Sequence, residues 1–140
     1  MAKKRPQQAT AKKTSAPRKM TETILDFGRP LIERLGRDSK PETVHDMFQI
    51  IIIVWNAYVR AMPAWGHPES LQNLRELAND ESNPELLRYA FGILTLRRVE
   101  RFAHDARAVG DWAVSLNPDD GELKFGCQAV LPPSSDDAKA

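Results

Sequence analysis

The feature that most constrains the fold is an unbroken apolar run, residues 50–55, inside the segment 42–62. At about 100° per residue, a helix over this segment gathers most of its apolar side chains on one broad face. These are Val44, Met47, Phe48, Ile51, Val54, Trp55, Tyr58 and Met62. The polar side chains form a narrow opposite stripe of Glu42, His45, Gln49, Asn56 and Arg60. Such a pattern predicts a central core helix whose polar stripe faces solvent.

Further helices are predicted on both sides of this segment. Residues 21–36 have helical spacing, but Gly28 and Pro30 interrupt it, so we expect a kinked helix or two short ones. Residues 69–78 and 84–104 predict two more helices. Polar residues that favour helix starts suggest caps at Thr21–Thr23, at Ser39 and at Asn83.

The segment 84–104 changes its apolar face halfway along. The first half places Leu86, Leu87, Ala90, Ile93 and Leu94 on one side. The second half places Leu96, Val99, Phe102 and Ala103 on nearly the opposite side, while Arg97, Arg98, Arg101 and His104 continue the first line. We therefore expect this helix to pass from the core to a second contact, such as the C-terminal segment.

After residue 110 the apolar period changes from helical to alternating. Residues 112–116 and 123–131 alternate around Asp120-Gly121, which predicts a β-hairpin with one apolar face. A lone hairpin is marginally stable, so its Trp112 and Phe125 side should pack on a helix, and we expect this to be the last helix, residues 84–104. The predicted fold class is α+β, mainly helical, with about four helices around a central apolar helix and a C-terminal β-hairpin. The domain spans 21–131, and 132–140 is a disordered polar tail.

Charge is distributed very unevenly along the chain. The first 20 residues contain seven basic side chains and no acidic one, whereas the remainder has 13 basic and 19 acidic side chains. The basic residues are Lys3, Lys4, Arg5, Lys12, Lys13, Arg18 and Lys19. Residues 1–20, here called the basic arm, lack large apolar side chains and are predicted to be disordered when free. Our leading hypothesis is a non-enzymatic protein whose basic arm binds nucleic acid or a ribonucleoprotein; the alternative for the arm is a solubilising terminus.

The sequence does not assemble a catalytic, cofactor or metal site. A single cysteine, Cys127, excludes an internal disulfide and is expected to be a buried strand residue. Glu100 and His104 are spaced to share a helix side, but no second histidine lies close to them. The longest apolar run is too short to span a membrane. We expect a cytoplasmic protein without cofactor or metal, and the sequence leaves its oligomeric state open.

A second hypothesis is a protein–protein adapter or subunit of a small complex. Its interface would use Trp65, Arg97, Arg98 and Arg101, since arginines recognise carboxylates with two parallel hydrogen bonds. The alternatives are a solvated arginine face and a tryptophan that folds back over the core.

Scattered residues over about half of the chain resemble a group of short bacterial proteins with no assigned activity. The resemblance rests on Arg101-Phe102, Asp105, Arg107 and Val109-Gly110-Asp111-Trp112, together with Val54-Trp55-Asn56 and Trp65-Gly66. It implies a bacterial source and carries over no functional residue.

Overall fold

The computed structural model describes residues 19–36 and 38–133. The predictions of a disordered arm and tail fall largely outside these ranges. The described chain forms α2 (Met20–Phe27), α3 (Arg29–Ile32), α4 (Pro41–Arg60), α5 (Glu69–Ala78), α6 (Glu85–Arg101), β1 (Ala108–Leu116) and β2 (Leu123–Val130).

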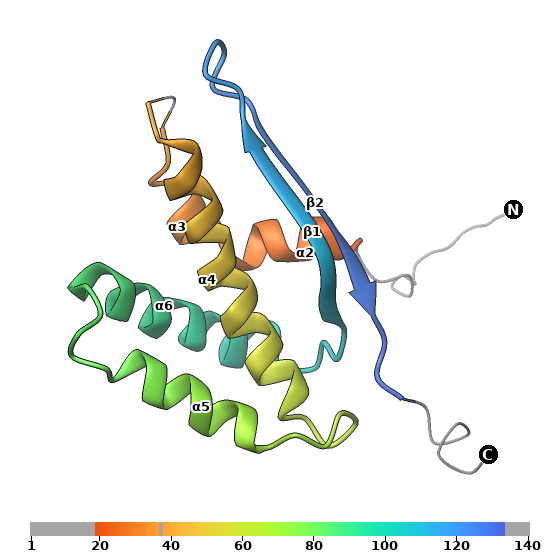
Figure 1. Ribbon diagram of the computed structural model, residues 1–140. Helices are drawn as coiled ribbons and strands as arrows, with labels where there is room; N and C mark the ends of the chain where they lie inside the picture. The colour runs from red at the N-terminus through yellow and green to blue at the C-terminus, as the bar shows by residue number, and fades with distance from the viewer. Residues whose placement is uncertain (1–18, 37, 134–140) are drawn as a thin grey trace, which may run out of the picture.

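The long helix α4 organises the molecule, and the predicted α+β, mainly helical class is confirmed. Figure 1 shows α4 running between the β1–β2 hairpin on one side and α5 with α6 on the other, while α2 crosses near the hairpin. No helix in the described ranges is both long and apolar enough to span the lipid bilayer.

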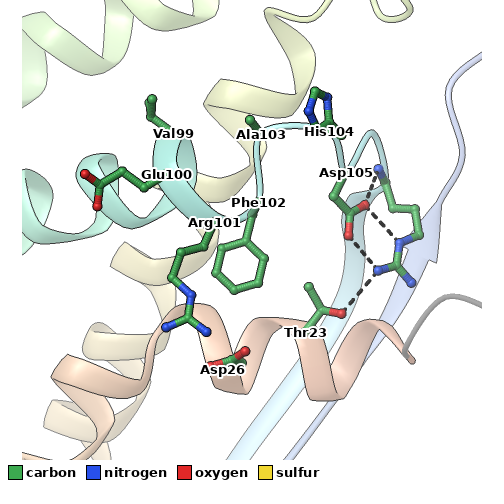
Figure 2. A pocket seen from close by; sticks show the side chains of 10 residues that line it. Thr23, Asp26, Val99, Glu100, Arg101, Phe102, Ala103, His104 and Asp105 are labelled. Atoms are coloured by element: carbon green, nitrogen blue, oxygen red, sulfur yellow. Dashed lines mark hydrogen bonds and ion pairs between the residues drawn. The ribbon is translucent and has the colours of Figure 1, made fainter. Parts of the chain in front are cut away.

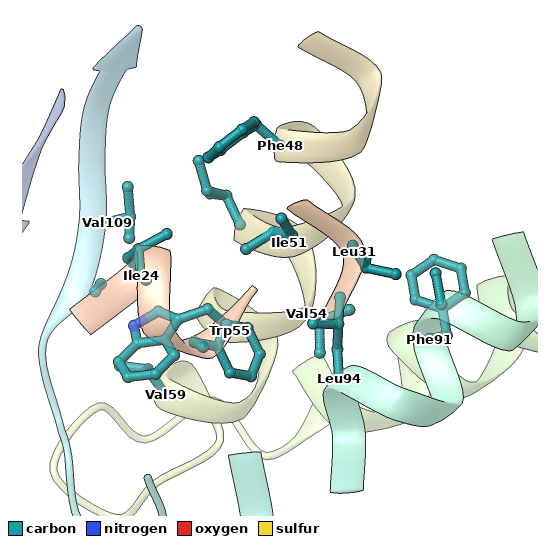
Figure 3. Packing of buried hydrophobic residues seen from close by; sticks show 14 of the residues in the cluster. Ile24, Leu31, Phe48, Ile51, Val54, Trp55, Val59, Phe91, Leu94 and Val109 are labelled. Carbon is teal, nitrogen blue, oxygen red and sulfur yellow. The ribbon is translucent and has the colours of Figure 1, made fainter. Parts of the chain in front are cut away.

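The core lies where α4 meets α2, α3 and α6. Figure 3 shows Trp55, Ile51 and Val54 of α4 directed toward α2, α3 and α6. Each of these three side chains is fully enclosed. The ring of Trp55 packs edge-on against Phe27, at 5.1 Å between centroids. The broad apolar face predicted for this helix is therefore confirmed.

The first helical segment is divided in two, as predicted, between Phe27 and Arg29. Gly28 lies so close to α4 that an added Cβ would be 2.5 Å from Cδ1 of Ile51. Pro30 then occupies the first turn of α3, where its missing N–H costs nothing. The break thus lets α2 and α3 approach α4 along two directions.

The hairpin is confirmed, and its first strand begins earlier than predicted. Its antiparallel register pairs Leu116 with Leu123, and one extra residue between Val109 and Trp112 forms a β-bulge. The connection spans residues 117–122, with Gly121 at a φ of 73°. On the inner face, Phe125 stacks on Phe48 of α4 at 4.7 Å between centroids. The hairpin thus packs on a helix, but that helix is the central α4 and not the last helix, as we had expected.

Side chains from two helices form hydrogen bonds with backbone groups of the two strands. Asn56 of α4 donates to Val109 O (3.0 Å) and accepts from Val109 N–H (2.7 Å) on β1. Thr21 of α2 likewise accepts from Cys127 N–H on β2 (3.2 Å). Unpaired strand edges promote unwanted pairing, so these contacts both orient the hairpin and protect it.

The expectation that the whole polar stripe of α4 faces solvent was therefore wrong. Asn56 is committed to β1, and the ring of His45 stacks on Trp112 at 4.9 Å. His45 is nevertheless exposed, as are Glu42, Gln49 and Arg60, so the expectation fails only at Asn56. The hairpin covers part of the stripe because its edge supplies hydrogen-bonding groups that an apolar face could not satisfy.

The predicted helix caps were also wrong. Lys40 and Pro84 occupy the cap positions of α4 and α6, without a side-chain cap bond. Ser39 instead accepts from Gly36 N–H (2.9 Å), and Asn83 donates to Leu77 O at the end of α5 (2.6 Å). These short polar side chains stabilise the loops that precede the helices, because loop backbone groups also need partners.

Candidate functional site

The segment from Asp105 to Arg107, here called the link, joins α6 to the hairpin. Its backbone carbonyls accept hydrogen bonds from side chains in three other parts of the fold. Its successive carbonyls accept from Arg98 Nη2 at Asp105 (2.6 Å), from Trp65 Nε1 at Ala106 (2.7 Å) and from Trp55 Nε1 at Arg107 (2.7 Å). Backbone carbonyls removed from water need such partners. The link is thus fixed to α4, to the α4–α5 connection and to α6 at once.

Arg98 is the most unusual side chain of this network. It is only 2% exposed and lies over the ring of Trp55, with Cζ 4.4 Å from the centroid. Its Nε and Nη1 atoms have no hydrogen-bond partner among the described residues. Burial lowers the pKa of Arg98 to about 10, partly offset by Asp105 and Tyr58, so the side chain stays charged at neutral pH.

The four residues predicted as an interface do not form one exposed surface. Arg98 and Trp65 donate into the link, as described above. Arg97 donates from Nε to Phe27 O (3.0 Å) and from Nη2 to Asp26 O (2.7 Å), which satisfies carbonyls at the end of α2. Only Arg101 is exposed. Whether any of them contacts a partner stays a prediction.

An open pocket of about 540 Å³ lies between the end of α6, the link and α2. Figure 2 shows Phe102 between Arg101 on one side and Asp105 on the other. Arg107 donates from Nη2 to Asp105 Oδ2 (2.6 Å) and to Thr23 Oγ1 (3.2 Å). This pair connects the link to α2.

Two charged side chains of the pocket, Asp105 and Arg107, are paired with each other. Burial alone would raise the pKa of Asp105, but the hydrogen bonds and charge of Arg107 outweigh it and the pKa is lowered. The hydrogen bond to Asp105 raises the pKa of Arg107. Thr23 is hydrogen-bonded to an arginine, which cannot accept its proton, so this contact does not activate it as a nucleophile.

The remaining candidate groups are separated. Figure 2 shows Glu100 and His104 pointing in different directions, because α6 ends at Arg101 before the two can share a helix face. Within the described ranges, no three His, Cys, Asp or Glu side chains are grouped to hold a metal ion. Cys127 is partly buried beside Thr21, and burial raises its thiol pKa, which lowers its reactivity at neutral pH.

The second apolar face predicted for residues 84–104 is only partly covered. Leu96 and Val99 are 57% and 55% exposed, whereas Phe102, at the end of α6, packs against Phe27 and Trp55 with 5.7 Å between ring centroids in each case. On the first line, Arg97 and Arg98 donate to backbone carbonyls and Arg101 is exposed. Sequence patterning did signal the irregularity, but it could not show that Arg98 is internal and Leu96 external.

An apolar groove of about 490 Å³ forms a further hollow. Its walls come from α3, α4 and α6, with Leu77 closing one end. Its lining includes Leu31, Met47, Ile50, Ile53, Leu87 and Phe91. The groove offers apolar contact and few polar groups, so it supplies no reactive chemistry.

Of the predicted nucleic-acid-binding residues, Lys19 is described and exposed at the start of α2, and the other six lie outside the described ranges. No family model, curated protein or solved structure matches the chain. Several residues behind the resemblance, including Trp55, Asn56 and Trp65, are donors to the link or to β1.

Proposed function

We propose that the protein is a non-enzymatic binding protein whose basic arm contacts nucleic acid or a ribonucleoprotein. The observation that carries the proposal is the separation of seven basic side chains from a remainder with a net charge of −6. Lysine and arginine side chains release counterions when they neutralise phosphates, which drives binding without reading sequence. The acidic body disfavours contact elsewhere, so binding concentrates on the arm.

The arm joins the body at a firmly held point. The carbonyl of Lys19 accepts from Thr23 N–H (3.0 Å), and Thr21 bonds to β2. The first turn of α2 thus fixes where the arm leaves the domain, beside the hairpin. The proposal places the protein in the cytoplasm, where nucleic acids and ribonucleoproteins are available.

The test compares the full chain with a variant in which Lys3, Lys4, Arg5, Lys12, Lys13 and Arg18 are replaced by glutamine. Fluorescence anisotropy at low salt would measure affinity for a labelled DNA duplex and for single-stranded RNA. We expect at least a tenfold loss of affinity, because six phosphate contacts are removed. A matched control shuffles the order of residues 2–18 and should bind as the native chain does. Unchanged affinity after neutralisation would overturn the proposal.

The second candidate is a protein–protein adapter or complex subunit. The observation that favours it is the exposed pair Leu96 and Val99 on α6. Arg101 is the interface residue from the original prediction whose side chain remains exposed. Pull-down with Leu96→Glu and Val99→Glu chains tests this candidate, and an unchanged set of captured proteins would contradict it.

A further inference from the structure

We propose that the outer face of α6 pairs with the same face of a second copy of this chain, in antiparallel orientation. The inference is independent of the nucleic-acid proposal and commits the adapter candidate to one partner. Its starting point is the spacing of residues 89, 92, 96 and 99, which follow one another at intervals of three, four and three. This is the heptad spacing by which two helices pack along a seam.

The seam is exposed along its length. Tyr89, Leu96 and Val99 are 48%, 57% and 55% exposed. Gly92 is exposed as well, and an added Cβ would meet nothing within 4 Å. The opposite side of the helix carries Ala90 and Leu94 into the core, so the seam faces directly away from the domain.

Antiparallel pairing makes this surface complementary to itself. In the register that sets Leu96 of one copy opposite Gly92 of the other, the large side chain meets the position with no side chain. The same register sets Tyr89 opposite Val99. The two-fold axis of the dimer repeats each of these two contacts, so four pairs of facing residues form along the seam.

The charges beside the seam favour the same arrangement. Arg34 lies over the ring of Tyr89, 5.0 Å from its centroid, and donates to its hydroxyl (3.4 Å). Glu100 lies one turn from Leu96 and, like Arg34, makes no ion pair with any residue in 19–36 or 38–133. The antiparallel register brings Glu100 of each copy to the Tyr89 end of the other, where Arg34 is held. Charge and size complementarity thus select the same partner.

The expected dimer is weak because one helix face buries a small area. Sedimentation velocity of the full chain from about 10 µM to about 1 mM should show a concentration-dependent shift from monomer toward dimer. Leu96→Glu should keep the chain monomeric throughout this range. Leu131→Glu is the matched control, since Leu131 is 70% exposed and lies beyond β2, and it should leave the shift unchanged.

A charge exchange tests the orientation. Arg34→Glu and Glu100→Arg should each weaken the dimer several-fold, and the double variant should restore it. A native chain that stays monomeric at about 1 mM overturns the proposal, as does a dimer that survives Leu96→Glu. Failure of the double variant to restore association overturns the antiparallel register. Glutamine replacement in the basic arm should not abolish the dimer, so failure of this inference and of the nucleic-acid proposal are distinguishable.

Discussion

At the residue scale, polar side chains on apolar-looking helices complete backbone hydrogen bonding elsewhere. Arg98, Trp55 and Trp65 donate hydrogen bonds to carbonyls of the link, and Asn56 donates to a carbonyl of β1. From the sequence, Arg98 and Trp65 were interface candidates and Asn56 was expected in solvent, whereas Trp55 was expected in the core. Burial makes these contacts important, because a donor or acceptor left without a partner away from water costs about 1–3 kcal/mol.

Asn56→Ala should destabilise the protein by about 2–4 kcal/mol, since it removes partners from both the N–H and the C=O of Val109. Urea unfolding followed by circular dichroism measures the change. Gln49→Ala provides a control on the same helix, where the side chain is exposed and the expected effect is within about 0.5 kcal/mol. Equal midpoints for the two variants would contradict the role of Asn56.

Asp105→Asn should lower stability at neutral pH by about 1–3 kcal/mol, because it weakens the charged bonds to Arg107. The folded-state pKa of Asp105 lies below its ordinary value of 3.8. The stability that the Asp105 carboxylate contributes is therefore complete above pH 3.8 and is lost as the pH falls through the lower folded-state pKa. Urea midpoints for native and variant chains should converge in strong acid. A gap that stays constant with pH would argue against the pair, and Asp111→Asn controls for general loss of charge.

At the element scale, hydrophobic period predicted most helices and both strands. The bounds of α5 match the prediction, and the split at Gly28 follows from the residues beside it. The cap residues of α4 and α6 were not predictable, because Ser39 and Asn83 have several backbone groups within reach and the sequence does not rank them. The sequence showed that arginines continue the apolar face of α6. Placing Arg98 in the core also requires knowing that it donates to the carbonyl of Asp105, beyond the end of the helix. Long-range partners of this kind leave no local pattern.

Gly28→Ala should destabilise the protein by about 1–3 kcal/mol, since the new methyl group would overlap the enclosed side chain of Ile51. Gly92→Ala is the counterpart on α6, where there is space and alanine favours helix by about 1 kcal/mol. Thermal unfolding at low protein concentration should therefore shift in opposite directions. A shift of the same sign and size in both would show that the α2–α4 contact is not tight.

At the scale of the whole molecule, the chain combines a basic arm, an acidic body and a helix with two faces. The inner face of α6 holds the link, while its outer face is available for pairing. If two copies pair through α6, two arms act together, and binding to a long polyanion gains from their effective concentration. Leu96→Glu should then weaken binding to a long duplex and leave binding to a short single strand nearly unchanged. Equal losses on both ligands would contradict this coupling.

If the arm binds polyanions by counterion release, as we propose, affinity must fall steeply as the salt concentration rises. Anisotropy titrations of the full chain with labelled DNA, from about 50 to 300 mM salt, give the slope of log affinity against log salt concentration. With up to seven basic side chains in contact, we expect a slope between about −3 and −6, falling near zero when the arm is neutralised with glutamine. A flat slope for the native chain, or the same steep slope without the arm's charges, would contradict the account.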